Sequence, residues 1–230
     1  MRETRSRSQG VLMARDALSA AGLILVFLLP LAAILMPFVK RDPVKVLFFS
    51  ILAQAIAIIA ATWIITRKRG VPWSKLGWRG NGHMAAIGIG VGVAIFLLVQ
   101  LLGWLFAIQS GSGSTNGLFA GAMTQQRSLY TLPALLLASG ILAPLSEELF
   151  FRGVLYTGLS NSFGSAIGIM VSSAIFTVLH GDFSLAALLI FIAGIVFALL
   201  YKKSGSLMVP IIAHGVHNLL TTLAAFMLMG

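Results

Sequence analysis

Residues 132–159 read LPALLLASGILAPLSEELFFRGVLYTGL, an apolar stretch that carries two adjacent glutamates and an arginine. About 20 apolar residues of helix cross the roughly 30 Å hydrocarbon core of a bilayer, so the stretch predicts a transmembrane helix. Pro144 is expected to kink it just ahead of the glutamates, because proline lacks an amide hydrogen. Charges inside such a helix are costly, so Glu147, Glu148 and Arg152 are the first candidates for function.

The composition places the whole chain in a membrane. Of its 230 residues 58% are hydrophobic and only 10% are charged, against roughly a quarter in soluble domains. The predicted fold is all-α, a polytopic bundle of about seven transmembrane helices. The other spans are expected at 17–39, 44–66, 84–108, 163–180, 183–201 and 207–229. The chain has no cysteine, which excludes disulfides, thiolate metal sites and a cysteine nucleophile.

Three segments between or beside the spans are predicted to differ from them. Residues 72–82, with Trp73 and Trp78, are expected to lie at the membrane interface, and a helix there or a re-entrant helix would make an eighth element. The polar, glycine-rich stretch 110–126 is interpreted as a linker, with a substrate gate as the alternative. Residues 1–16 form a basic tail, and residues 17–230 form one membrane domain with its catalytic core at about 132–229.

Glycines predict close helix contacts at two places. Gly88, Gly90 and Gly92 would let another helix approach the span at 84–108. Gly164 and Gly168 form a GxxxG pattern, interpreted as a packing face.

The net charge of +10 comes from 16 Lys and Arg against six acids. Most of the basic residues flank spans on the side of the N-terminus, which predicts a cytoplasmic N-terminus and, with seven spans, an external C-terminus. Clustering between apolar runs is an orientation signal, so no nucleic-acid partner is expected.

Helix geometry separates the two glutamates. Glu148 and Arg152 are four residues apart and about 40° apart around the helix, which favours an ion pair. Glu147 lies about 140° from Arg152, so one arginine does not serve both acids. Glu148 is therefore predicted to be paired and structural, and Glu147 to be unpaired and free to act as a general base.

The later spans add imidazoles and a carboxamide. His214 and Asn218 share a helix face, with His217 on its flank, and Phe176 is one turn from His180, where it can wall the pocket. A cavity lined by these groups and Glu147 has the parts to activate water and hold an oxyanion. Since His180 lies near the end of its span, the turn at 180–183 is expected to dip into the protein.

Three motifs carry a family resemblance. Glu147, Glu148 and Arg152 form EExxxR, Phe176 and His180 form FxxxH, and His214 and Asn218 form HxxxN. In this order, on separate apolar helices, they resemble the CAAX-protease and bacteriocin-processing (Abi) family of intramembrane proteases, including CAAX prenyl protease 2. The resemblance covers about residues 132–229.

The resemblance implies hydrolysis of peptide bonds inside a bacterial or archaeal plasma membrane. By carry-over, Glu147 with His180 activates water, His214 with Asn218 stabilises the oxyanion, and Glu148 with Arg152 supports the site. No role passes to His217. The implied substrates are membrane-associated peptides or lipidated proteins, such as prenylated C-termini or bacteriocin leaders.

Alternatives remain open at this point. Zinc could be held by Glu147, His180 and His214, but the HExxH helix of zincins is absent, and a metal-independent reaction is favoured. A non-catalytic immunity or scaffold protein, or a proton-coupled transporter, would use the same polar residues differently. The sequence leaves the oligomeric state open.

Overall fold

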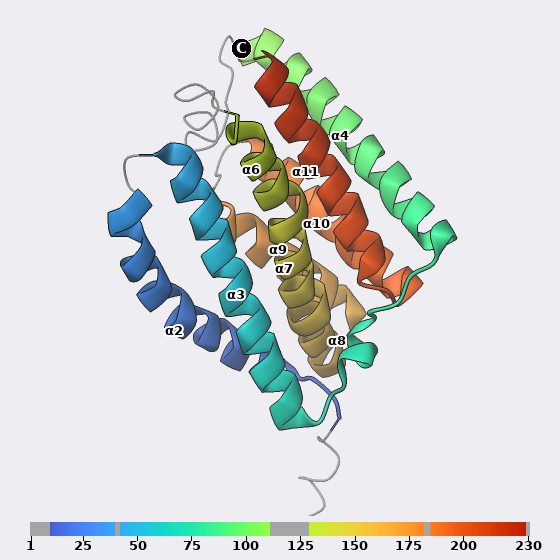
Figure 1. Ribbon diagram of the computed structural model, residues 1–230. Helices are drawn as coiled ribbons and strands as arrows, with labels where there is room; N and C mark the ends of the chain where they lie inside the picture. Colours follow the sequence, from blue (N-terminus) through green and yellow to red (C-terminus); the bar gives the residue numbers. More distant parts are fainter. Residues whose placement is uncertain (1–9, 40–41, 111–128, 182–184, 229–230) are drawn as a thin grey trace, which may run out of the picture.

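The structure is a computed structural model that describes residues 10–39, 42–110, 129–181 and 185–228. Every regular element in these ranges is helical (Figure 1). The α-helices are α2 (Ala14–Val39), α3 (Pro43–Arg69), α4 (Gly82–Ser110), α6 (Thr131–Leu137), α7 (Ala143–Glu148), α8 (Thr157–Phe163), α9 (Ser165–Leu179), α10 (Leu185–Ser204) and α11 (Met208–Leu228). A short 3₁₀-helix η1 (Trp73–Leu76) and two π-helical segments, η2 (Ala138–Leu142) and η3 (Leu149–Tyr156), complete the set.

The prediction of an all-α bundle with about seven spans is confirmed. Within the described residues, six helical segments are long and apolar enough to cross a membrane, and α9 is a shorter apolar helix. Those six are Ala14–Leu35, Pro43–Arg69, Gly82–Leu105, Thr131–Phe163, Ala186–Ser204 and Met208–Met227. The predicted linker at 110–126 and most of the basic tail lie outside the described residues.

Local sequence explains where the helices start and stop, as α3 illustrates. The Asp42 carboxylate accepts hydrogen bonds from the backbone N–H groups of Val44 and Lys45, and Pro43 occupies the first turn, where a missing amide hydrogen costs nothing. Gly70 ends the helix at φ 66°, a left-handed conformation that suits glycine.

The segment 131–163 runs through the middle of the bundle (Figure 1). It contacts α3 on one side and α9 and α11 on others. Two π-helical segments interrupt it: η2 immediately precedes the turn that holds Pro144, and η3 follows the glutamates and carries Arg152. Proline and π-turns both disturb the regular hydrogen-bond ladder, and here they flank the site.

Outside this centre the helices pack in pairs: α4 against α11, α2 against α3, and α10 against α9. Gly88 and Gly92 confirm their prediction, because a Cβ at either would press into α11, at Ile212 and at the Ala213 carbonyl. The prediction was wrong for Gly90, which faces open space. Helix α11, the carrier of His214, is therefore held tightly against α4.

The predicted fifth span is shorter than expected. Gly164, at φ 90°, ends α8 and separates it from α9, so it does not pack within a GxxxG face. Gly168 does pack closely, against Ser160 of α8. The 15 residues of α9 reach about 22 Å, less than a bilayer core. The C-terminal end of α9, with His180 as its cap, thus stops short of the full span.

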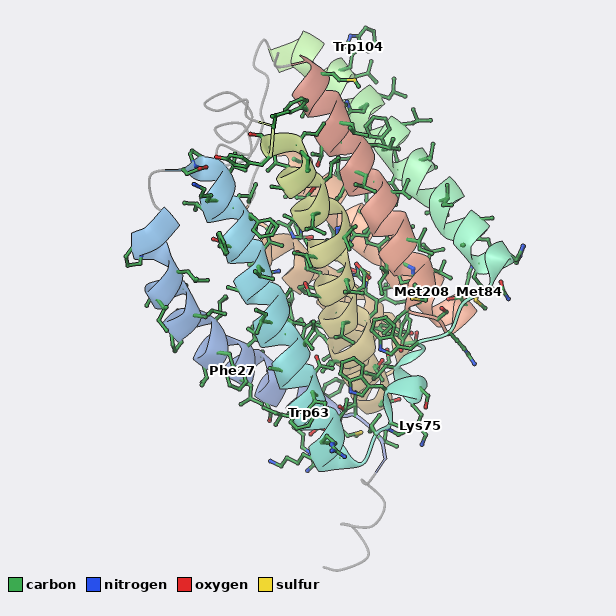
Figure 2. All side chains as sticks on the ribbon, in the orientation of Figure 1. Phe27, Trp63, Lys75, Met84, Trp104 and Met208 are labelled. Carbon is green, nitrogen blue, oxygen red and sulfur yellow. The ribbon has the colours of Figure 1, made fainter. Side chains whose placement is uncertain are left out.

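Aromatic side chains mark the two ends of the bundle. Figure 2 shows Trp63 toward the lower end and Trp104 at the upper end, and both are exposed as interfacial anchors would be. Trp73 and Trp78 behave differently, because their rings stack with centroids 6.1 Å apart and pack against the core.

The start of α2 is fixed to the rest of the fold. The Asp16 carboxylate is buried and lies 2.6 Å from Arg69 Nη2, at the end of α3. Asn161 donates a hydrogen bond to the Leu12 carbonyl and Ser162 accepts one from the Ala14 amide, which ties the same segment to α8. These contacts set the position of α2, which forms one wall of the cavity described next.

Candidate active site

Glu148 and Arg152 form the predicted ion pair. Arg152 Nη1 donates to Glu148 Oε1 at 2.8 Å. The Arg152 side chain is 1% exposed and that of Glu148 is 0% exposed. Arg152 Nη2 also donates to the Gly194 carbonyl of α10 at 2.9 Å. The guanidinium lies 4.9 Å from the ring centre of Phe176 and 5.3 Å from that of Phe197, within the range of cation–π attraction. The ion pair is thus buried inside the helix bundle.

His214 lies between the two glutamates. Its Nδ1 is 2.9 Å from Glu148 Oε1, and its Nε2 is 4.0 Å from Glu147 Oε2. Since a carboxylate only accepts, Nδ1 carries the hydrogen, and Nε2 faces Glu147. The imidazole stacks on Phe197 with ring centres 4.9 Å apart. Glu148 therefore orients His214 as well as pairing with Arg152.

Glu147 lies in more open surroundings than its neighbour. Its side chain is 14% exposed, and its Oε1 accepts a hydrogen bond of 3.2 Å from Gln54 Nε2 of α3. The prediction that Glu147 is unpaired was right about Arg152 but wrong about polar partners, because it took no account of α3. Oε2 has no hydrogen-bond partner among the described residues.

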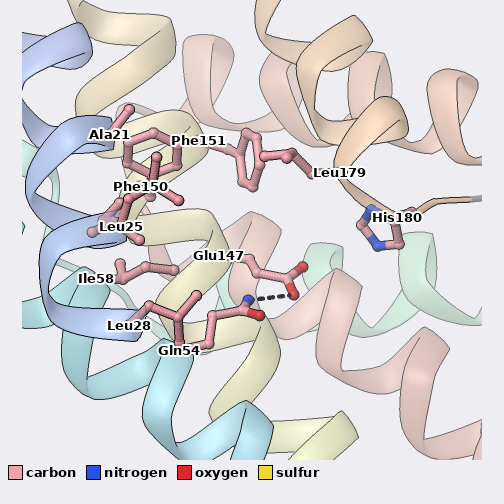
Figure 3. Close-up of a pocket in the computed structure, with 11 residues that line it drawn as sticks. Ala21, Leu25, Leu28, Gln54, Ile58, Glu147, Phe150, Phe151, Leu179 and His180 are labelled. Carbon is pink, nitrogen blue, oxygen red and sulfur yellow. Dashed lines mark hydrogen bonds between the residues drawn. The ribbon is translucent and has the colours of Figure 1, made fainter. Parts of the chain in front are cut away.

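A cavity of about 420 Å³ opens beside Glu147, a size typical of ligand sites. Figure 3 shows Glu147, Gln54 and His180 facing it among apolar side chains. Its apolar lining comes from α2, α3, η3 and α9: Ala21, Ile24, Leu25, Leu28, Ile58, Phe150, Phe151 and Leu179. A carboxylate and an imidazole thus meet in a largely apolar space.

His180 reaches this cavity from the end of α9. Its Nδ1 is 2.7 Å from the Phe176 carbonyl, and the two rings lie 4.3 Å apart, so Phe176 walls the imidazole as predicted. Because Nδ1 donates to that carbonyl, the other ring nitrogen, Nε2, is available as an acceptor. Of the turn predicted to dip inward, Asp182 and Phe183 lie outside the described residues.

His214 and Asn218 do not line the cavity, which corrects the prediction of a shared lining. Asn218 Nδ2 donates to the Ser139 carbonyl at 2.8 Å, within η2. There α11 and η2 approach so closely that a Cβ on Gly215 would meet the Gly140 carbonyl. The π-turn therefore brings Ser139 within reach of Asn218.

The zinc alternative requires at least three side-chain ligands around one point. In the described part of the chain, no three His, Asp or Glu side chains come together so as to hold a metal ion. Glu147, His180 and His214 are the residues that the sequence offered; Nδ1 of His214 is bonded to Glu148 and Nδ1 of His180 to a backbone carbonyl, which leaves Nε2 of each ring free.

Sequence reasoning missed several neighbours of the site. Gln54 was detectable as a lone carboxamide on an apolar helix, the same signal that singled out Asn218. Gly194 and Phe197, which contact Arg152 and His214, carry no such signal, since their contributions are a backbone carbonyl and an apolar ring.

Comparison with known proteins agrees with this geometry. Residues 128–220 match the family model described as Type II CAAX prenyl endopeptidase Rce1-like. Residues 128–220 of this chain are therefore similar to the Rce1-like family. The matched range includes Glu147, His180, His214 and Asn218 and excludes α2, α3 and Gln54. The family resemblance inferred from the three motifs is confirmed.

Curated relatives point the same way. YdiL of Bacillus subtilis (strain 168), provisionally named a membrane peptidase, is 33% identical over 39% of this chain and 36% of its own length. The membrane-embedded CAAX protease MroQ of Staphylococcus aureus (strain USA300) is 30% identical over 66% of this chain and 57% of its own. An uncharacterized 24.3 kDa protein of Escherichia coli is 28% identical over 64% of this chain and 61% of its own length.

The matches thus span between about one third and three fifths of these relatives' lengths. No solved structure matches this chain significantly.

Proposed function

We propose that this protein is an intramembrane endopeptidase that hydrolyses peptide bonds of membrane-associated substrates. One observation carries the proposal: of two adjacent glutamates, Glu148 is fully enclosed by Arg152 and His214, while Glu147 faces a cavity together with His180. A general base must reach its proton within about 3 Å, directly or through one water, and only a group at a cavity can do so.

The proposed reaction needs only groups of this chain, a water and a peptide. Glu147, aided by His180, takes a proton from water, whose oxygen forms a bond to the carbonyl carbon while the carbonyl electrons move onto oxygen. The tetrahedral intermediate then collapses: its C–N bond breaks, and Glu147 returns the proton to the departing nitrogen. We favour this metal-independent route because, within the described ranges, no three His, Asp or Glu side chains come together as a metal site.

His214 and Asn218 are proposed to stabilise the oxyanion. Nδ1 of His214 is bonded to Glu148, which leaves Nε2, on the Glu147 side, as the ring nitrogen that would donate to the oxyanion. Asn218 has a second N–H beside the one bonded to Ser139. Since neither side chain lines the cavity, the substrate carbonyl is expected to enter past Glu147.

The relatives' names suggest the substrate class. The Rce1-like family is named for CAAX prenyl substrates, and MroQ is named a CAAX protease. Bacteriocin leaders are the second substrate class that the three motifs imply. The apolar cavity walls suit a lipidated or hydrophobic peptide. We further propose a cytoplasmic N-terminus, from the bias of basic residues toward that side.

The test is cleavage by the full-length purified protein in lipid vesicles. A quenched-fluorescent peptide library, with and without a prenyl group, is compared for wild type and for Glu147→Ala, His180→Ala and His214→Ala. The control is His83→Ala, a histidine exposed at the start of α4. Wild type and control should cleave, and the three site variants should not. Equal cleavage by all five proteins, or none by wild type, contradicts the proposal.

A chelator in the same assay tests the metal-independent route. Activity is expected to persist. Complete loss that zinc restores would replace this mechanism by a metal-dependent one.

A further inference from the structure

Gln54 stands out on α3, outside the region that the family model matches. The helix around it is apolar, and the residues one turn away on either side are Ser50 and Ile58. A half-buried carboxamide in such surroundings costs free energy unless it is hydrogen-bonded. Its Nε2 is bonded to Glu147 Oε1 at 3.2 Å, the one side-chain hydrogen bond to Glu147 in the described chain.

This bond makes the two oxygens of Glu147 unequal. Oε1 is held by Gln54, whereas Oε2 has no hydrogen-bond partner and lies 4.0 Å from His214 Nε2. A distance of 4.0 Å is too long for a direct hydrogen bond, and Oε2 is buried on the His214 side of the carboxylate. Figure 3 shows the Gln54 amide on one side of the carboxylate and His180 across the cavity.

Gln54 also lies between two hollows. It lines the cavity of about 420 Å³ with Glu147, and a second cavity of about 290 Å³ between α2 and α3. Without the amide, the Glu147 side chain would have space on that side to adopt other rotamers. Losing a defined position by about 1 Å can reduce a reaction rate 100-fold.

We infer that Gln54 is a positioning residue for Glu147: its amide holds Oε1 and thereby fixes the orientation of the carboxylate at the cavity where water is activated. The inference rests on the proposed function. It assigns a role to a helix that the three motifs do not reach, so the site is completed by the N-terminal half of the chain.

A plain structural role is the competing explanation. Carboxamides do join helices within membranes, with modest energies. That role predicts a change in stability alone. Positioning predicts a fall in kcat with little change in KM, and a change in the pH profile.

The experiment uses Gln54→Leu, Gln54→Asn and Gln54→Glu in the full-length protein in vesicles, with Ser50→Ala as the matched control. Ser50 lies one turn earlier on α3 and lines only the second cavity. Hydrogen bonds to charged groups have strengths that correspond to roughly a 10- to 100-fold fall in kcat for the Leu and Asn variants. KM should stay within about threefold, and Ser50→Ala should match wild type.

Gln54→Glu gives a signature that stability cannot mimic. Two carboxylates in contact share a proton at low pH, so the acidic limb of the kcat profile should move to higher pH. If Gln54→Leu and Gln54→Asn keep the kcat and pH profile of wild type while Glu147→Gln is inactive, the inference is overturned. An equal loss in Ser50→Ala overturns it too.

Failure of the proposed function would look different. In that case cleavage would not depend on Glu147 at all, and the positioning role would fall with it. The hydrogen bond itself is checked separately by thermal unfolding of Gln54→Leu, Glu147→Ala and the double variant. Non-additive shifts support the contact, and additive shifts contradict it.

Discussion

Two regions meet at neighbouring residues of one helix. The ion cluster, formed by Glu148, Arg152 and His214, is enclosed and hydrogen-bonded. The cavity side, formed by Glu147, Gln54 and His180, borders open space. Successive helix positions point about 100° apart. The two glutamates can therefore have different roles: Glu148 fixes the geometry of the site, and Glu147 stays available to react.

Energetics explains why the ion cluster is worth keeping. Burying an ion pair seldom stabilises a fold by itself, because desolvation offsets the attraction. Breaking such a pair is costly, however, since it leaves one charge buried without compensation. The cluster therefore enforces one arrangement of α7, η3 and α11, and that arrangement places Glu147 at the cavity.

The largest expected effect is in the ion cluster. Arg152→Met leaves Glu148 without its cation and should lower the free energy of unfolding by about 3–5 kcal/mol. Thermal or denaturant unfolding in detergent measures it. Arg15→Met, at an exposed position of α2, should change little. If both variants unfold alike, the cluster does not stabilise the fold.

The next effect should appear on the cavity side, in rate and not in stability. His180→Ala removes an exposed imidazole whose ring contacts Phe176, through a hydrogen bond to its carbonyl and against its aromatic ring. Cleavage should fall at least about 100-fold, as for loss of a general acid–base group, while the unfolding temperature stays near that of wild type. A large drop in that temperature would place His180 with the ion cluster instead.

A smaller effect tests how α11 supports the ion cluster. A Cβ at Gly92 would meet the carbonyl of Ala213, next to His214, whereas one at Gly90 meets nothing. Gly92→Ala should cost about 1–3 kcal/mol through overpacking. Gly90→Ala should be neutral or slightly stabilising, because alanine favours helix. Equal unfolding temperatures for the two variants would contradict the close packing of α4 on α11.

The smallest effect lies far from both regions. Partial desolvation raises the pKa of Asp42, but hydrogen bonds from Lys45 and Tyr130 and the Lys45 charge outweigh it and hold this pKa below its ordinary 3.8. Because the pKa of Asp42 is lower in the folded state, its carboxylate stabilises the fold at pH values above the ordinary 3.8. This stabilisation is lost as the pH falls through the lower pKa of the folded state.

Tyr130→Phe should therefore cost about 0.5 kcal/mol at neutral pH and nothing in strong acid. Unfolding curves at both pH values measure the difference, and cleavage at neutral pH should be unaffected. A cost that is equal at the two pH values would show that the Asp42 carboxylate is not involved.

Much of this comparison could be predicted from the sequence. The four-residue spacing of Glu148 and Arg152 was sufficient to predict their ion pair, because two residues one turn apart meet within a single helix. The same holds for Phe176 and His180. Span number and the close approach at Gly88 and Gly92 follow from hydropathy and from missing side chains, which are local properties.

The rest depends on how helices meet. Gln54 contacts Glu147 only because α3 lies beside α7, and no single-helix pattern encodes that neighbour. The π-helical segments η2 and η3 have no periodic signal, yet η2 brings Ser139 to Asn218. Gly164 fits a GxxxG pattern, but its positive φ shows that it serves a turn.

The most direct test of this division of labour measures Glu147→Gln and Glu148→Gln side by side in one vesicle preparation, for both unfolding and cleavage. Glu147→Gln should keep the stability of wild type within about 1 kcal/mol, since an amide can still accept from Gln54, and lose cleavage by about 10²–10⁴-fold. Glu148→Gln should be destabilised by about 3–5 kcal/mol. If Glu147→Gln proves the less stable of the two, or still cleaves at the wild-type rate, the account is wrong.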